Sequence, residues 1–70
     1  MKLSARNTLK GKVVSVETGA VNGIVKIDIG GGVIITSSIT NNAIKELALE
    51  EGKEAYAVIK ASNVMVGVDE

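Results

Sequence analysis

Short stretches rich in valine and isoleucine recur along this chain, and in several of them apolar and polar residues alternate. Ile24–Ile29 alternates throughout, and Lys12–Glu17 carries β-branched residues on both faces, with Val14 and Val16 on one and Val13 with Ser15 on the other. Alternation with a period of two is typical of a β-strand, and β-branched residues favour strands. The pattern therefore predicts an all-β fold.

Three further stretches read as strands. The third runs from Val33 to Thr40, the fourth covers Glu54–Ala61 and the fifth covers Asn63–Val68. With one short helix between the third and the fourth, five strands in this order predict an OB-like five-stranded barrel. Closing the barrel would remove sheet edges that otherwise invite aggregation.

The short helix is predicted over Ala43–Ala48. Ile44, Leu47 and Ala48 follow one another at i, i+3 and i+4, which places them on one stripe facing the core. Thr40 and the two asparagines after it are residues that cap helix N-termini. The same residues have a second interpretation, because free N–H groups in a first helical turn favour an anion.

Glycine-rich segments separate the first three strands. Gly19–Gly23 contains Asn22-Gly23, a hairpin signal, and the tight turn can lie at Gly19 or at Asn22. Gly30–Gly32 has an anion-cradling interpretation, but a phosphate-binding loop opens a helix and this one opens a strand. The three glycines therefore favour a plain hairpin turn, where they supply positive φ.

Composition limits how such a chain can be stabilised. The chain has 70 residues, 46% of them hydrophobic, and it lacks Cys, His, Phe and Trp, so that Tyr56 is its only aromatic residue. Disulfides and the usual zinc sites are thereby excluded. A core of this size seldom supplies more than about 3–5 kcal/mol. We therefore expect a single domain, residues 1–70, in an obligate homo-oligomer that shares apolar surface between subunits.

Charge and motif content exclude several function classes. Zero net charge and a single aromatic residue argue against nucleic-acid binding, and an OB-type oligonucleotide-binding module stays only as an alternative. Nothing resembles a nucleophile–base pair, so we expect no enzyme. No run approaches the ~18 apolar residues of a membrane span, and the N-terminus has no signal-peptide core. We expect a cytoplasmic protein without a membrane partner.

The only arginine lies in Ser4-Ala5-Arg6-Asn7. A guanidinium carries five donors in a planar fork and stays charged, which suits an oxyanion. A solvated N-terminal arm is the simpler interpretation of this stretch alone. Lys60, beside Ser62 at the end of the fourth predicted strand, is either a second cation for such a site or a solvated edge charge.

Several motifs together resemble the molbindins, small single-domain molybdate-binding proteins built from one Mop domain. The resemblance covers Leu3 to about Val68. The motifs that carry it are Ser4-Ala5-Arg6-Asn7, Leu9-Lys10-Gly11-Lys12-Val13-Val14, Ile39-Thr40, Glu51-Gly52-Lys53-Glu54 and Val58-Ile59-Lys60-Ala61-Ser62-Asn63-Val64-Met65.

The resemblance implies a hexamer, a trimer of dimers, that binds molybdate or tungstate at subunit interfaces and serves molybdenum storage or homeostasis. The anion would be held by hydrogen bonds rather than by metal ligation, with no metal-ligating or catalytic residue. The implied oxyanion-binding residues are Ser4, the backbone of Ala5 and Arg6 from one subunit, with Thr40, Ala43, Lys60 and Ser62, some from a neighbour. Certain relatives carry a hydroxyl where this chain has Ala43. A purely structural oligomerisation module is the remaining alternative.

Overall fold

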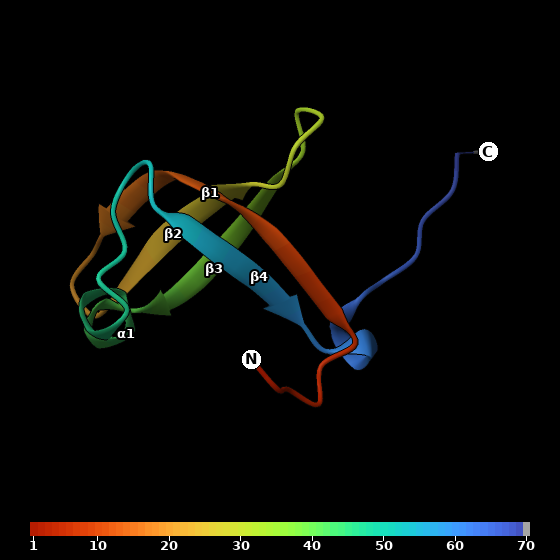
Figure 1. The fold of residues 1–70 in the computed structure, drawn as a ribbon, viewed down its shortest axis with the longest axis horizontal. Coiled ribbons are helices and arrows are strands. Elements are labelled where there is room, and N and C mark those ends of the chain that lie inside the picture. The colour runs from red at the N-terminus through yellow and green to blue at the C-terminus, as the bar shows by residue number, and fades with distance from the viewer. Residues whose placement is uncertain (70) are drawn as a thin grey trace.

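The computed structural model describes residues 1–69; Glu70, the last residue of the predicted domain, lies outside them. Figure 1 shows a single antiparallel sheet that curls into a half-barrel, with one short helix at its end. The sheet order is β3-β2-β1-β4. The elements are β1 (Asn7–Thr18), β2 (Asn22–Asp28), β3 (Ile34–Thr40), α1 (Asn41–Glu46), β4 (Glu54–Ile59) and the 3₁₀ turn η1 (Ala61–Asn63).

The core lies on the concave face of this sheet. Its buried members are Val13, Val25, Ile27, Ile44 and Ala57. The expected alternation of β2 is confirmed, because Val25 and Ile27 are buried while the residues beside them face solvent. So small a core leaves much of the apolar side-chain surface uncovered.

A β-bulge in β1 changes which of its valines face inward. The register shifts between Val13, which pairs with Ile27, and Ser15. Val14 is the extra residue and is 42% exposed, whereas Val16, three positions after the buried Val13, packs against the core. The prediction that Val14 and Val16 share a face was wrong, because one inserted residue reverses the alternation that follows it.

The first strand is also longer than its apolar pattern indicated. β1 begins at Asn7 rather than Lys12, and its added half pairs with β4 from Asn7↔Ile59 to Lys12↔Glu54. That half contains Gly11, where a Cβ would collide with the Asp28 carbonyl oxygen and the Ile27 side chain of β2. Pairing with β4 thus forms a strand from residues with little strand propensity of their own.

Only one residue of α1 is buried. Thr40 is the N-cap, as expected, and Ile44 is buried with its Cδ1 2.5 Å from where a Cβ on Gly23 would lie. The predicted stripe was wrong in part: Leu47 is 59% exposed and Ala48 has left the helix with φ 51°.

The end of α1 explains this exposure. The N–H of Leu49 donates to the Ile44 carbonyl at 3.0 Å, and that of Ala48 donates to the Lys45 carbonyl at 3.0 Å. These two bonds form a Schellman motif with Ala48 at its left-handed position. Lys53 Nζ also donates to the carbonyls of Leu47 and Ala48, at 2.7 and 3.1 Å. The helix therefore ends at Glu46, two residues earlier than the spacing suggested.

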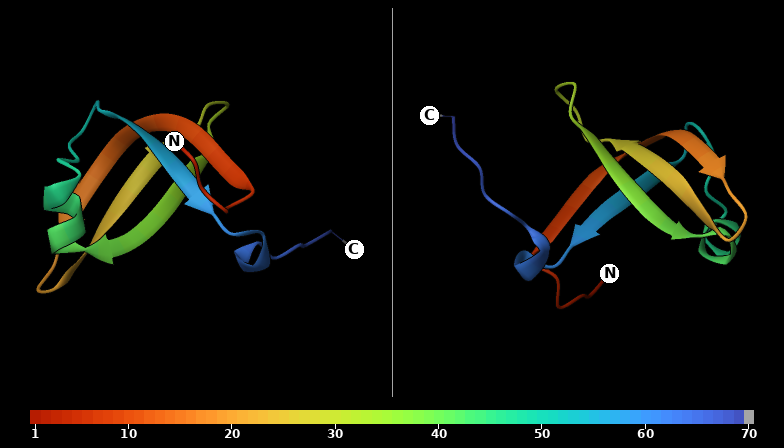
Figure 2. Two further views of the ribbon diagram at one scale, coloured as in Figure 1. Left: turned by 60° about the horizontal axis from the view of Figure 1, so that its bottom comes forward. Right: turned by 180° about the vertical axis from the view of Figure 1, so that it is seen from behind.

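The predicted fifth strand does not form, which corrects the five-stranded barrel to a four-stranded half-barrel. β4 ends at Ile59, η1 occupies Ala61–Asn63, and residues 64–69 have no strand pairing. Their alternating valines fit a strand, but a strand needs a neighbour for its backbone N–H and C=O groups. Figure 2 shows this segment leaving the body of the molecule instead.

The two glycine-rich turns close hairpins. The N–H of Gly19 donates to the Asn22 carbonyl at 2.9 Å, so the reversal begins at Gly19 while Asn22 already belongs to β2. Gly30, Gly31 and Gly32 have φ values of 100°, 62° and 79°. These conformations confirm that the second turn depends on glycine.

Candidate functional site

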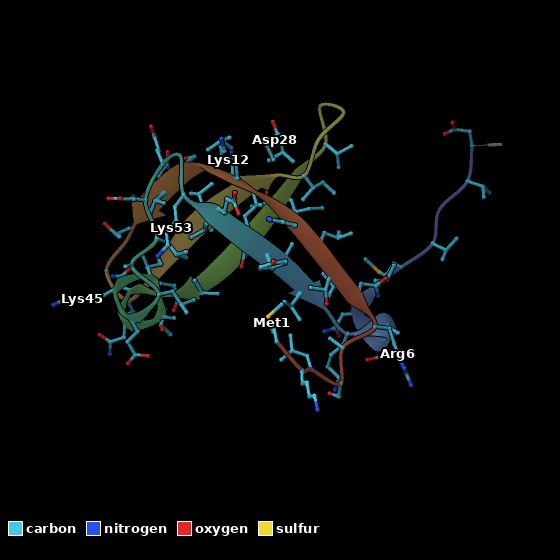
Figure 3. The ribbon with its side chains drawn as sticks, in the orientation of Figure 1. Met1, Arg6, Lys12, Asp28, Lys45 and Lys53 are labelled. Carbon is cyan, nitrogen blue, oxygen red and sulfur yellow. The ribbon has the colours of Figure 1, made fainter. Side chains whose placement is uncertain are left out.

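One end of the molecule gathers five of the seven predicted site residues. Asn7 pairs with Ile59 where β1 begins and β4 ends, and its Nδ2 donates to the Ile59 carbonyl at 3.3 Å. Because the strands are antiparallel, Arg6, which precedes β1, and Lys60, which follows β4, both lie beyond this pair at the same end of the sheet. Figure 3 shows Arg6 at this end, next to the turn that follows β4. Both cations are exposed.

The small residues of the prediction lie next to these cations along the chain. Ser4 and Ala5 directly precede Arg6, and Ser62 lies in η1, which is closed by the Asn63 N–H donating to the Lys60 carbonyl at 2.9 Å. Ala5 is half-buried, whereas the two serines are exposed. We call Ser4, Ala5, Arg6, Lys60 and Ser62 the arginine end.

No carboxylate of residues 1–69 forms a salt bridge with Arg6 or Lys60. Within residues 1–69 the only salt bridge joins Lys10 Nζ to Glu54 Oε2 at 3.2 Å, along β1 and away from Arg6. There, the hydrogen bond and the charge of the Glu54 carboxylate raise the pKa of Lys10 above its ordinary value.

The other two predicted residues, Thr40 and Ala43, lie at the opposite end. Thr40 pairs with Asn22, and the residue after Asn22 pairs with Thr18, the last residue of β1. The 12 residues of β1 span roughly 35–40 Å along the strand at ~3.3 Å each. Figure 3 shows Arg6 and Lys45 of α1 at opposite ends of the molecule. Within one chain, Thr40 and Ala43 cannot touch an anion held by Arg6.

Thr40 and Ala43 contact each other. The Ala43 N–H donates to Thr40 Oγ1 at 3.1 Å, which is the capping interaction expected of a residue before a helix. We call these two residues the helix end. The Thr40 hydroxyl keeps its own proton for donation to a second acceptor.

An open apolar groove is the feature that the sequence analysis missed. Its volume is about 770 Å³, and its lining includes Ile35, Ser37 and Ile39 of β3 together with Ala55 and Ala57 of β4. The sequence signal for this groove was the small residues on the inward faces of both edge strands, because they leave space that no side chain fills.

The described residues contain no cluster of three acidic, Cys or His side chains suited to a metal ion. Across residues 1–69, no helix combines the length and the apolar character needed to cross a membrane.

Comparison with known proteins gives consistent matches. The model of the TOBE domain family matches residues 3–66. A probable molybdenum-pterin-binding protein of Haemophilus influenzae is 67% identical over 69 residues, covering 99% of this chain and all of that protein.

Two solved structures share the fold. MopII from Clostridium pasteurianum has a TM-score of 0.89 and 45% identity, covering 96% of this chain and 100% of its own. The cytoplasmic molybdate-binding protein ModG, with molybdate bound, has a TM-score of 0.94 and 54% identity, and the match covers 99% of this chain and 49% of ModG.

The relatives are named for binding. The Haemophilus protein is named for binding molybdenum-pterin, and ModG is named for binding molybdate. This confirms the expectation of a binding protein rather than an enzyme.

Proposed function

Because the chain belongs to the TOBE domain family, as a single-domain molbindin, we propose that it binds molybdate or tungstate between the subunits of a homo-oligomer. One observation carries the interfacial part of this proposal. The arginine end and the helix end lie at opposite ends of β1, so a site that uses both must take each from a different copy.

The chemistry of the two ends suits a tetrahedral dianion. Arg6 and Lys60 supply two positive charges, and no carboxylate of residues 1–69 pairs with either. Ser4, Ser62, Thr40 and the backbone N–H groups of Ala5 and Ala43 supply directional donors. Charge-assisted hydrogen bonds contribute about 1.5–3 kcal/mol each. Donors held at the ends of paired strands and of a capped helix are preorganised, which lowers the entropy lost on binding.

We further propose a hexamer, arranged as a trimer of dimers, that stores or buffers the anion in the cytoplasm. Residues 1–70 form one Mop domain in this proposal. ModG, which spans two such lengths, is described as cytoplasmic and as holding molybdate. Tungstate has the same charge and shape as molybdate and is bound by the same donors, whereas the smaller sulfate is held more weakly.

Calorimetric titration of the oligomer with molybdate tests the proposal. Arg6→Ala removes at least one charge-assisted bond and is expected to raise Kd by about 100-fold, since each tenfold corresponds to about 1.4 kcal/mol. Lys2→Ala, which removes a neighbouring exposed cation outside the arginine end, is the matched control and leaves Kd unchanged. Native mass spectrometry with molybdate counts subunits and anions together.

Equal affinities of Arg6→Ala and the parent would disprove the assignment of Arg6. A folded hexamer that gives no heat with molybdate would instead favour the purely structural oligomerisation module.

A further inference from the structure

The helix that follows Thr40 and contains Ala43 is held only weakly by packing. α1 has six residues, Asn41–Glu46, and Ile44 is the only one of them that is buried. A helix of this length has little stability of its own in water. The direction of the Thr40 hydroxyl therefore depends on what else attaches the start of α1 to the sheet.

Asn41 supplies that attachment. Its backbone N–H donates to the Val21 carbonyl at 2.8 Å, and its Nδ2 donates to the Gly19 carbonyl at 2.9 Å. Both acceptors belong to the turn between β1 and β2, which lies beside α1 in Figures 1 and 2. The Gly19 N–H in turn donates to the Asn22 carbonyl at 2.9 Å, and Asn22 pairs with Thr40. The turn and the start of α1 are thus joined by a closed set of contacts.

The side-chain amide of Asn41 is fixed in one orientation. Its Oδ1 is buried and accepts no hydrogen bond within residues 1–69, and it lies 3.2 Å from where a Cβ on Gly23 would be. Turning the amide over would place this oxygen against the Gly19 carbonyl oxygen, and two acceptors repel. A buried acceptor without a donor is unfavourable, and an apolar side chain of similar size would fill the same space without it. The hydrogen bond to Gly19, rather than packing, therefore accounts for the amide.

From these contacts we infer that Asn41 is a positioning residue for the anion site, which holds the Thr40 hydroxyl in the direction that the anion requires. The inference rests on the proposed function and extends it to a residue whose backbone N–H and Nδ2 are already bonded within the chain. Two hydrogen bonds attach residue 41 at two points, which leaves the preceding hydroxyl one direction. With the backbone bond alone, the start of α1 pivots about the Val21 carbonyl. Binding then has to order the helix end as well, which weakens affinity.

Calorimetric titration of Asn41→Leu with molybdate tests the inference. Leucine has a similar volume and removes both the bond to Gly19 and the unpartnered oxygen, so the oligomer is expected to remain folded. Its Kd should rise by about tenfold, the scale expected for the loss of one ordering hydrogen bond.

Lys53→Met is the control for a general loosening of α1. Lys53 Nζ donates to the carbonyls of Leu47 and Ala48 at the far end of the helix, at 2.7 and 3.1 Å. Thr40 and Leu47 are roughly 10 Å apart at ~1.5 Å per residue, and titration in about 0.15 M salt screens the lost charge over that distance. The midpoint of thermal unfolding should fall in this variant while its Kd stays unchanged.

A double-mutant cycle separates positioning from a general loss of structure. Because Asn41 acts through the Thr40 hydroxyl, Asn41→Leu should weaken binding in the parent and have hardly any effect on Kd in a Thr40→Ala background. An equal effect in both backgrounds would overturn the inference. So would a loss of affinity in Lys53→Met as large as that in Asn41→Leu.

Hydrogen exchange without molybdate tests the inference independently of anion binding. The Ala43 N–H, which donates to Thr40 Oγ1 at 3.1 Å, should exchange faster with solvent in Asn41→Leu than in the parent. Unchanged exchange of this N–H would refute the positioning role. Faster exchange in Asn41→Leu, together with a parent that gives no heat with molybdate, would refute the proposed anion site while leaving Asn41 as the residue that orders the helix end.

Discussion

Mixing two binding-deficient variants tests the interfacial site most directly. Arg6→Ala removes the guanidinium from the arginine end, and Thr40→Ala removes the hydroxyl from the helix end. In an oligomer of Arg6→Ala alone, every site lacks its arginine-end guanidinium. In an oligomer of Thr40→Ala alone, every site lacks its helix-end hydroxyl. When both are refolded together, a site can take its arginine end from the Thr40→Ala chain and its helix end from the Arg6→Ala chain.

The size of the recovery follows from the placement of the two ends. Arg6 precedes the first residue of β1, whereas Thr40 lies beside its last residue. These two ends of β1 are separated by roughly 35–40 Å along the strand, so no anion bridges Arg6 and Thr40 within one chain. In an equal and random mixture, each half is drawn independently, and about one quarter of the sites become intact. Calorimetry should then measure tight molybdate binding at about one quarter of the parent stoichiometry.

Two controls make this result interpretable. Arg6→Ala mixed with the double variant Arg6→Ala/Thr40→Ala contains no arginine at position 6 and should recover nothing. Thr40→Ser keeps a hydroxyl that accepts from the Ala43 N–H, as Thr40 does at 3.1 Å, and should bind like the parent. Thr40→Ala itself costs about 1 kcal/mol of helix stability through loss of the cap. Mixtures that bind no better than the separate variants would refute a site shared between copies.

Two further predictions concern the stability of α1. Ala48→Gly should stabilise the protein by about 1 kcal/mol, because Ala48 has φ 51° and glycine adopts this conformation without a Cβ clash. The midpoint of thermal unfolding should rise by about 4–8 °C. An unchanged midpoint would contradict the backbone strain inferred at Ala48. Ile44→Ala should destabilise by about 2–5 kcal/mol, because Ile44 is the only buried residue of the helix. Chemical denaturation measures that loss, with the exposed Leu47→Ala as the control that changes little.

The sequence was sufficient for features that depend on local pattern. The alternation of β2, the cap at Thr40 and the glycine turn at Gly30–Gly32 each follow from the residues involved. The bulge at Val14 and the early start of β1 depend on pairing with β2 and β4, which no local pattern contains. The prediction of a fifth strand was wrong for the same reason, because its valines have strand propensity but no neighbouring strand within their own chain.

The residues proposed for the site come from the sequence, whereas their arrangement comes from the structure. Arg6 and Lys60 are far apart in sequence and become neighbours only through the Asn7↔Ile59 pairing. Their separation from Thr40 follows from sheet topology, which spacing along the chain does not reveal. Side-chain chemistry alone therefore suggests which residues suit an anion. The register of the sheet is needed to predict which of these residues lie near one another.

The thin core has a consequence for how the protein persists at low concentration. Within residues 1–69 of one chain, only five hydrophobic residues are buried, namely Val13, Val25, Ile27, Ile44 and Ala57. In the proposed homo-oligomer, contact between copies therefore supplies much of the folding free energy. The unfolding temperature should therefore rise with protein concentration. An anion bound between copies would add to the free energy of unfolding, by about 2.7 kcal/mol when the free anion concentration is a hundred times Kd. Supply of the anion would then govern the amount of folded protein, and a depleted solution would lose its binding capacity through unfolding.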